Sequence, residues 1–307
     1  MLDAVEQVTT AARDGSIKAC ILVSHAGLND SVVVVAFRGT ASLVDWLVNL
    51  DGDLEDAASF INAHSTSETA AAVAAHAGLL RVAKAMAEIV CDKIMSTATA
   101  SPAADQQPIL LLTGHSAGGG VAGLMSAHIR AQRRDIQSRF KTMHCVTFAA
   151  PPVLSSPSVA GASSMSSGLS LNIVNFGDIV PRASKSYIRS LLALYNERAE
   201  HVVDREWEFG EPDAWNYGSN VLLVDVSDPD AQDDNYTLPA EAGGSADVED
   251  DEPDIRAFGV SSDVWKRLAF GSVKTHPMDV YLESITALRP KEDDPLGTAT
   301  SSSQTEC

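Results

Sequence analysis

Short runs of apolar, often β-branched residues alternate along the chain with longer segments whose apolar positions recur about every three or four residues. The short runs predict buried strands, and the longer segments predict helices packed against a core. The predicted strands are 19–24, 31–37, 109–113, 142–148, 171–176 and 220–226. The predicted helices are 70–95, 118–140, 184–195 and 277–288. Strands that alternate with helices favour an α/β fold with a mostly parallel central sheet and helices on both faces.

Three segments lack this patterning. They are a connector rich in Ala, Ser and Pro at 96–107, an acidic stretch at 225–254 and a polar tail from 290 onward. The acidic stretch has nine Asp and three Glu but no Lys or Arg, so self-repulsion favours an extended, solvated chain. We therefore expect one α/β domain over 1–290, with a disordered acidic insertion at 227–256 and a disordered tail over 291–307.

A serine flanked by glycines follows the strand predicted at 109–113. The sequence Gly-His-Ser-Ala-Gly at 114–118 is a Gly-x-Ser-x-Gly turn between a strand and a helix. Such a turn holds its serine in a strained backbone conformation and lifts the hydroxyl out of the sheet, and the glycines remove Cβ atoms that would clash. Ser116 is therefore the candidate nucleophile of a hydrolase.

A serine nucleophile needs a histidine base, and in the α/β-hydrolase arrangement the chain order is serine, acid, histidine. This order excludes His25, His64, His76 and His115. Of the later histidines, His128 and His144 lie inside a predicted helix and a predicted strand. His201 lies in a segment of mixed charge that suggests a solvated helix face. His276 stands just before Pro277, which suits the first turn of a helix, so His276 is the predicted base.

The acid that orients this histidine is expected at the carboxyl end of a strand. Asp178 lies in the turn that follows the strand predicted at 171–176, and it is the preferred candidate. Asp225, after the apolar run 221–224, is the rival, but it opens the acidic stretch, which is a poor place for a buried carboxylate. Asp178 would hold His276 in the tautomer that accepts the serine proton.

The negative oxygen that forms during ester cleavage needs two backbone N–H donors. Ala117 is expected to supply one, because it directly follows the nucleophile. Thr40 is expected to supply the other, because it lies in the turn after the β-branched run 31–37.

Several motifs occur together with these residues. They are Phe-Arg-Gly-Thr at 37–40, Asp-Trp at 45–46, His-Ala-Gly at 76–78, Gly-His-Ser-Ala-Gly-Gly at 114–119, Thr-Phe-Ala-Ala-Pro at 147–151, Asp-Ile-Val-Pro at 178–181, and His276 with Tyr281. In residues and order they resemble the class 3 lipases, a family that includes fungal triacylglycerol lipases and diacylglycerol lipases. The resemblance covers about 32–288. It implies an α/β-hydrolase fold, a triad of Ser116, Asp178 and His276, and an oxyanion site at Thr40 and Ala117.

The resemblance also implies a short lid helix after Thr40. Leu43, Trp46 and Leu47 are apolar at helical spacing and would cover the site, although the same spacing fits an ordinary buried helix face. Ala149 stands where the family usually has glycine, which we expect to be a mild change in packing. The acidic insertion lies where diacylglycerol lipases carry a regulatory insertion, so regulation is the alternative to a simple solvated loop.

These features predict a serine hydrolase that cleaves fatty-acyl esters of glycerolipids, a di- or triacylglycerol lipase, through an acyl-enzyme. The alternatives are a phospholipase, an esterase for soluble esters, and a catalytically silent lipid-binding relative. The expected partner is an acylglycerol or other lipid ester at a lipid interface. The net charge of −19 argues against nucleic acid and against tight adsorption to anionic membranes, and leaves peripheral contact with neutral lipid surfaces open.

The cysteines and the N-terminus bear on cofactors and location. The four cysteines, Cys20, Cys91, Cys145 and Cys307, have no metal-ligand spacing and favour reduced thiols, so we expect no metal and no cofactor. The first twenty residues lack the apolar core of a signal peptide, and no run approaches about 18 apolar residues. We expect a cytoplasmic protein, with peripheral contact at membranes or lipid droplets.

Overall fold

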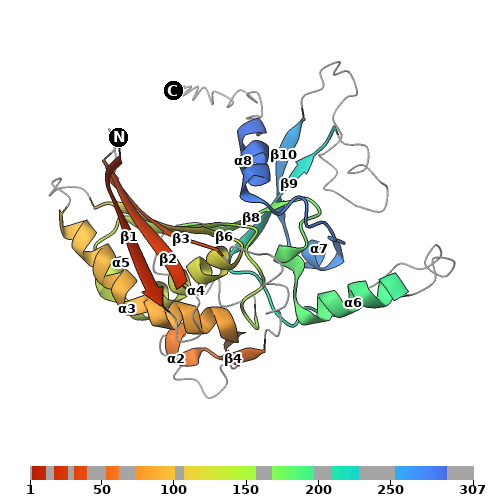
Figure 1. The fold of residues 1–307 in the computed structure, drawn as a ribbon, viewed down its shortest axis with the longest axis horizontal. Coiled ribbons are helices and arrows are strands. Elements are labelled where there is room, and N and C mark those ends of the chain that lie inside the picture. The colour runs from red at the N-terminus through yellow and green to blue at the C-terminus, as the bar shows by residue number, and fades with distance from the viewer. Residues whose placement is uncertain are drawn as a thin grey trace, which may run out of the picture.

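An eight-stranded sheet organises the computed structural model, which describes residues 2–11, 17–26, 31–39, 53–61, 73–100, 107–156, 168–196, 209–227 and 253–288 (Figure 1). Its strands are, in spatial order, β1 (Leu2–Ala11), β2 (Ile17–Ala26), β3 (Ser31–Phe37), β6 (Ile109–His115), β7 (Thr142–Phe148), β8 (Ser170–Asn175), β9 (Ser219–Asp225) and β10 (Ile255–Val260). A separate small sheet pairs β4 (Leu54–Asp56) with β5 (Ala74–His76).

The centre of the large sheet is parallel and its two edges are antiparallel. Strands β3, β6, β7, β8 and β9 run in one direction. The pairs β1–β2, β2–β3 and β9–β10 are antiparallel. Parallel neighbours need long crossover connections, which α3 (Ala77–Ala100) supplies between β3 and β6 and α4 (Ala117–Gln132) between β6 and β7. The predicted mostly parallel α/β sheet is confirmed.

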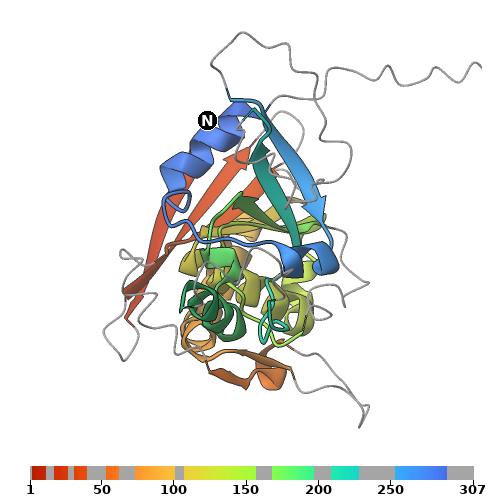
Figure 2. The same ribbon diagram turned by 90° about the vertical axis from the view of Figure 1, so that its right-hand side faces the viewer.

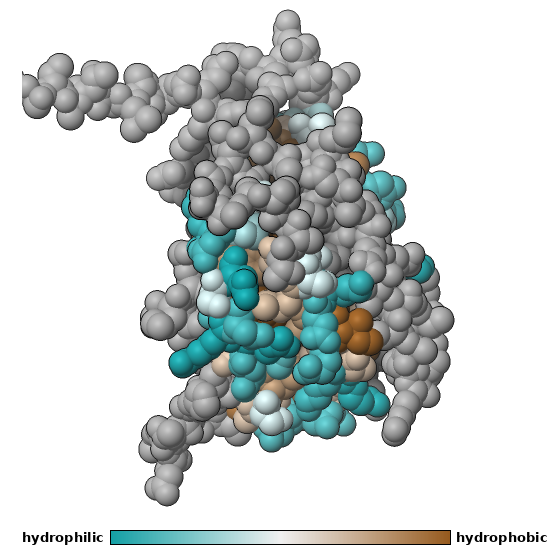
Figure 3. Space-filling view, turned by 90° about the vertical axis from the view of Figure 1, so that its left-hand side faces the viewer, coloured by the Kyte–Doolittle hydropathy of each residue, from teal (hydrophilic) through white to brown (hydrophobic). Residues whose placement is uncertain are grey.

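Helices cover both faces of the sheet. Helices α3 and α4 lie on one face, and α8 (Met278–Ala287) lies on the other (Figures 1 and 2). Leu110 and Leu112 of β6 face α4 and are fully buried. On the opposite face, the ring of Tyr281 in α8 packs against the rings of His115 and Phe148. On the side of the molecule that carries α3, the described surface is mainly hydrophilic, with small apolar groups between the polar side chains (Figure 3).

The remaining helices are α2 (Ala58–Ile61), α5 (Arg134–Gln137), α6 (Lys185–Asn196), α7 (Ser262–Arg267) and the 3-10 helix η2 (Val180–Arg182). Every predicted strand and helix corresponds to an observed element, but several ends differ. The helix predicted at 70–95 begins only at Ala77, because 74–76 form β5, and it continues to Ala100 through part of the predicted connector. The helix predicted at 118–140 is interrupted at Arg133, where the Gln137 amide donates to the last carbonyls of α4.

Two strands at the sheet edges, β1 and β10, have no predicted counterpart. Strand β10 pairs with β9, with Ile255 opposite Asp225, so Ile255 and Arg256 belong to the sheet and not to the predicted acidic insertion. The carboxylate of Asp225 accepts hydrogen bonds from the backbone N–H groups of Ser227 and Asp254, at 3.0 and 3.2 Å. The two ends of the acidic segment are therefore joined, while residues 228–252 lie outside the described residues.

Candidate active site

Ser116 is the single residue between β6 and α4. Its backbone has φ 58° and ψ −131°, a conformation that costs a residue with a side chain about 1–3 kcal/mol. Close packing accompanies this turn: a Cβ on Gly118 would lie 2.2 Å from the carbonyl oxygen of Phe37, and a Cβ on Gly114 would lie 2.5 Å from the carbonyl of Gly118. The glycines therefore let β3, β6 and α4 approach one another closely, which holds the serine turn in place.

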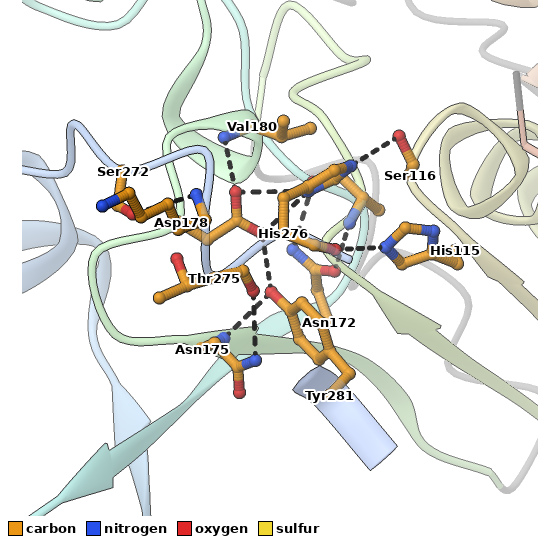
Figure 4. A network of polar contacts seen from close by, with 12 residues as sticks. His115, Ser116, Asn172, Asn175, Asp178, Val180, Ser272, Thr275, His276 and Tyr281 are labelled. Atoms are coloured by element: carbon orange, nitrogen blue, oxygen red, sulfur yellow. Dashed lines mark hydrogen bonds and ion pairs between the residues drawn. The ribbon is translucent and has the colours of Figure 1, made fainter. Parts of the chain in front are cut away.

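Ser116, His276 and Asp178 form a hydrogen-bonded row (Figure 4). Nε2 of His276 lies 3.0 Å from Oγ of Ser116, and its Nδ1 lies 2.9 Å from Oδ2 of Asp178. Because a carboxylate only accepts hydrogen bonds, Nδ1 donates the ring proton and Nε2 is left as the acceptor for the serine hydroxyl. All three residues are buried, and Asp178 is completely so. In this geometry an imidazole can remove a proton from serine.

The carboxylate of Asp178 has two donors besides His276. Its Oδ1 accepts from the backbone N–H of Val180 at 2.9 Å, and its Oδ2 accepts from the hydroxyl of Tyr281 at 2.8 Å. Burial raises the pKa of the Tyr281 hydroxyl well above its usual value, and the charge of Asp178 acts in the same direction. The tyrosine therefore stays protonated and remains a donor. The acid is held by contacts from its own turn and from α8.

His276 lies in the segment between α7 and α8, directly before the proline that precedes α8, as predicted. This segment is tied to the turn that follows β8: Ser272 exchanges backbone hydrogen bonds with Gly177 and Ile179, at 2.9 and 3.0 Å. The side-chain amide of Asn175, at the end of β8, donates to the carbonyl that precedes His276, at 3.2 Å. The acid turn and the histidine segment are thus joined by main-chain contacts as well as by the ring.

The rival residues are engaged elsewhere or lie outside the described residues. The carboxylate of Asp225 braces the junction of β9 and β10. His128 bonds the carbonyl of Phe60 through Nδ1 at 2.8 Å, and His144 bonds a threonine on its own strand. His201 falls among residues that the structure does not describe.

The structure describes Ala117, one of the two predicted oxyanion donors, but not Thr40. Ala117 is the first residue of α4, and the N–H groups of a first helical turn have no acceptor within the helix. A Cβ on Gly39 would lie 3.6 Å from the Cβ of Ser116, so the segment after β3 lies beside the Ser116 turn, and Thr40 follows Gly39 in the chain. Thr40 itself and the predicted lid residues Leu43, Trp46 and Leu47 lie outside the described residues.

Two contacts of this site were not anticipated from the sequence. His115, excluded as a base, bonds the backbone carbonyl of His276 through Nε2 at 2.8 Å. Tyr281, which the sequence placed in the helix predicted at 277–288 and in a motif with His276, directs its hydroxyl to Asp178. The available signals were the position of His115 next to Ser116 and the occurrence of a polar aromatic residue one turn into the helix after His276.

Ala149 follows β7 in the same way that Ser116 follows β6, and its φ is 51°. The predicted effect of this alanine was a mild change in packing, but its positive φ adds a cost in backbone conformation. A left-handed conformation costs a residue with a Cβ about 1 kcal/mol more than it costs glycine. Replacing the usual glycine by alanine therefore places strain at this turn.

Cys91 and Cys145 are free and buried, and burial raises the pKa of their thiols to about 11 and about 12. Within the part of the chain that the structure describes, no group of three or more His, Cys, Asp or Glu side chains could hold a metal ion. None of the helices described is long and apolar enough to cross a bilayer.

Comparison with known proteins agrees with the motifs. The model of the family described as Lipase (class 3) matches residues 34–187, about half of the chain, a span that contains Ser116 and Asp178. No curated protein matches.

Solved structures of fungal lipases also match. A triacylglycerol lipase from Penicillium expansum has 16% identity and a TM-score of 0.49, over 72% of this chain and 69% of that chain. A Rhizomucor miehei triacylglyceride lipase has 17% identity and a TM-score of 0.46, over 73% and 68%. A lipase from Rhizopus microsporus var. chinensis has 20% identity and a TM-score of 0.44 over 57% of this chain, which spans only 54% of that lipase. By its family match over half of its length, the chain belongs to the class 3 lipase family.

Proposed function

We propose that the chain is a serine hydrolase that cleaves fatty-acyl esters of glycerolipids, a di- or triacylglycerol lipase. The observation that carries this proposal is the buried row of Ser116, His276 and Asp178 in a member of a lipase family. Oγ of Ser116 attacks the ester carbonyl while Nε2 of His276 takes its proton. The imidazolium then gives the proton to the leaving glyceryl oxygen, and the acyl group stays on the serine. Water, activated by the same ring, releases the fatty acid.

The surrounding residues support this proton transfer. The hydrogen bond to Asp178 places the proton of the neutral His276 ring on Nδ1, so Nε2 faces the serine as an acceptor, and the carboxylate stabilises the imidazolium that forms. The donors at Val180 and Tyr281 hold that carboxylate in position. The backbone N–H of Ala117, together with that of Thr40, would bind the oxyanion, and the loss of one such donor costs about 3 kcal/mol of transition-state stabilisation.

The lid is part of the same proposal. Leu43, Trp46 and Leu47 would cover the site in water and face lipid at an interface, because apolar area left in water costs about 25 cal/mol per Å². The partner would be an uncharged or zwitterionic lipid surface, since a chain with a net charge of −19 is repelled by an anionic one.

The test combines a fluorophosphonate probe with a panel of a diacylglycerol, a triacylglycerol, a phospholipid and a short soluble ester. We expect the wild type to be labelled and to cleave the acylglycerols fastest, and Ser116→Ala to lose both labelling and hydrolysis. Ser284→Ala is the control, because that hydroxyl bonds only a carbonyl of its own helix among the contacts described. Labelling that persists in Ser116→Ala would refute the nucleophile, and an unlabelled wild type would indicate a silent relative.

The same panel tests the lid. Emulsified esters should be cleaved faster than the same esters as monomers, and Trp46→Ala should reduce turnover at the interface more than turnover of the soluble ester. An equal effect of Trp46→Ala on both substrates would make this segment ordinary core and the protein a simple esterase.

A further inference from the structure

His115 contacts His276 through a hydrogen bond and through its ring. Its Nε2 lies 2.8 Å from the carbonyl oxygen of His276, and the two imidazole rings pack with centroids 4.7 Å apart and planes tilted by 36° (Figure 4). The ring of Tyr281 meets the His115 ring edge-on at 5.9 Å. We infer that His115 is a positioning residue, which holds the main chain of His276 at the distance from Ser116 that proton transfer requires. This inference rests on the proposed function.

The contact is a defined hydrogen bond. A carbonyl oxygen only accepts, so Nε2 of His115 must carry a hydrogen and donate it. Burial lowers the pKa of His115, although the bond to the His276 carbonyl acts in the opposite direction. A neutral ring suits the site, because a second positive charge beside His276 would oppose formation of the imidazolium. Since its Nε2 hydrogen is directed at that carbonyl, His115 acts through His276 and not as a second base.

The hydrogen bond adds a link to the main chain of His276 between two parts of the site that otherwise meet through side chains. Ser116 and His276 are separated by 160 positions in the chain. The described backbone and amide contacts that tie the 272–276 segment to the sheet go to the acid side, at Asn175, Gly177 and Ile179. His115 instead belongs to β6 and is bonded covalently to the nucleophile. Without its donor, His276 stays anchored to the acid but loses its main-chain link to the serine strand.

Loss of the His115 donor should therefore lower kcat and the labelling rate but leave KM nearly unchanged. A misplacement of about 1 Å can cost a reaction about 100-fold in rate. In His115→Phe, which keeps a ring but has no donor, we expect kcat on a soluble ester and the rate of fluorophosphonate labelling to fall about 100-fold, with KM within about two-fold of wild type. In His115→Gln we expect both rates within about three-fold of wild type, because the Gln amide can place a donor near the former Nε2.

Two controls separate positioning from general damage. His144→Phe changes a half-buried histidine on the neighbouring strand β7, whose ring bonds a threonine on its own strand and the backbone N–H of Leu169 before β8. Neither partner touches the triad, so this variant should retain wild-type kcat. The low-field proton NMR signal of the His276 ring N–H bonded to Asp178 should persist in His115→Phe, because the acid side stays in place. If His115→Phe does not fold, the pair His115→Gln and His115→Met gives the same comparison, since the two side chains have similar length and only Gln has a donor.

A wild-type kcat in His115→Phe, or an equal loss in the Gln variant and in the variant without a donor, would overturn the inference. So would loss of the low-field signal, which would indicate structural collapse of the site. These outcomes differ from failure of the proposed function. A wild type that the probe does not label contradicts the proposed function, whereas a labelled wild type with an equally fast His115→Phe variant contradicts only the positioning role.

Discussion

Two neighbouring strands are each followed by a non-glycine residue with a positive φ, but only one of these two residues has a hydroxyl group. Strand β6 is followed by Ser116 with φ 58°, and β7 by Ala149 with φ 51°. The turns lie side by side, because the last residues of the two strands are paired and the N–H of Ser116 donates to the carbonyl of Phe148 at 2.9 Å. Ser116 has a hydroxyl 3.0 Å from His276, whereas Ala149 has only a methyl group. Strain at a strand end is therefore no sign of catalysis by itself.

The turn after β7 has a structural explanation. The N–H of Ala149 donates to Ile173 of the neighbouring strand at 2.9 Å, and the N–H of Ala150 donates to the side-chain oxygen of Asn172 at 3.0 Å. Asn172 is completely buried. A Cβ on Gly119 of α4 would lie 2.9 Å from the Cβ of Ala150, so this turn also packs closely against the helix that follows Ser116. The hydrogen bonds of Ala149 and Ala150 offset the strain at Ala149, and they hold this turn against the one at Ser116.

Ser116→Gly should produce the largest effect. We expect hydrolysis to fall by about 10⁴-fold or more, because triad members act as a unit. We also expect the free energy of unfolding to rise by about 1 kcal/mol, since glycine adopts a positive φ without steric strain. Ester hydrolysis and denaturant titration measure the two effects. Ser116→Ala is the control, because it removes the hydroxyl but keeps the strained Cβ; equal stability of the two variants would show that the turn stores no strain.

A second pair of neighbouring strand ends carries the two candidate acids. Asp178→Asn should reduce kcat by about 10³- to 10⁴-fold, because an amide no longer holds His276 in the accepting tautomer. Asp225→Asn should leave kcat near wild type, since this carboxylate only joins β9 to β10 among the contacts described. Ester hydrolysis at a fixed pH measures both. If Asp225→Asn proved the inactive variant, the assignment of the acid would be wrong.

These comparisons show which parts of the structure were readable from the sequence. The turn at Ser116 is local, so glycine spacing and the preceding apolar run located Ser116 within its strand–turn–helix unit. Asp178 and His276 required only chain order and their positions at a strand end and before a helix. The bond from His115 to His276 joins side chain and main chain across a separation of 161 positions, for which the sequence offers no periodicity.

Ala149 and β10 differ from the sequence-based predictions because contacts between distant parts of the chain determine their structure. The positive φ of Ala149 accompanies its hydrogen bond to Ile173 and the packing of the next residue, Ala150, against Gly119 of α4, so it could not be inferred from the residue type. Strand β10 is a short edge strand at the end of an acidic stretch, and its pairing with β9 outweighed a composition that favoured disorder. Propensity is a weak prior when tertiary pairing supplies the hydrogen bonds.

Ala149→Gly should have a smaller effect than the changes at the acid. Glycine adopts φ 51° without a Cβ penalty, so the free energy of unfolding should rise by about 1 kcal/mol and the melting temperature by about 2–4 °C, with kcat unchanged. Thermal unfolding followed by circular dichroism measures the shift. Ala150→Gly is the matched control: Ala150 is also buried but does not have a positive φ, so this change should give no gain. A gain in both variants would refute the strain at Ala149.

The smallest expected effect concerns the buried cysteine thiols, one of which lies on β7, next to the strand that precedes Ser116. Cys145 of β7 is buried, and burial raises the pKa of its thiol to about 12, while that of Cys91 in α3 rises to about 11. Because the thiolate is the reactive form, these groups should be inert at pH 8, where the probe still modifies Ser116. In a Cys20→Ser, Cys307→Ser variant, a chromogenic disulfide reagent should detect no thiol in the folded protein and both thiols in denaturant. The unfolded thiols ionise near the usual value of about 8.5, well below the folded ones, so stability should fall as the pH rises above about 9. Fast reaction of either thiol in the folded protein at pH 8 would contradict this burial and would make β7 far more accessible than the strand that presents Ser116.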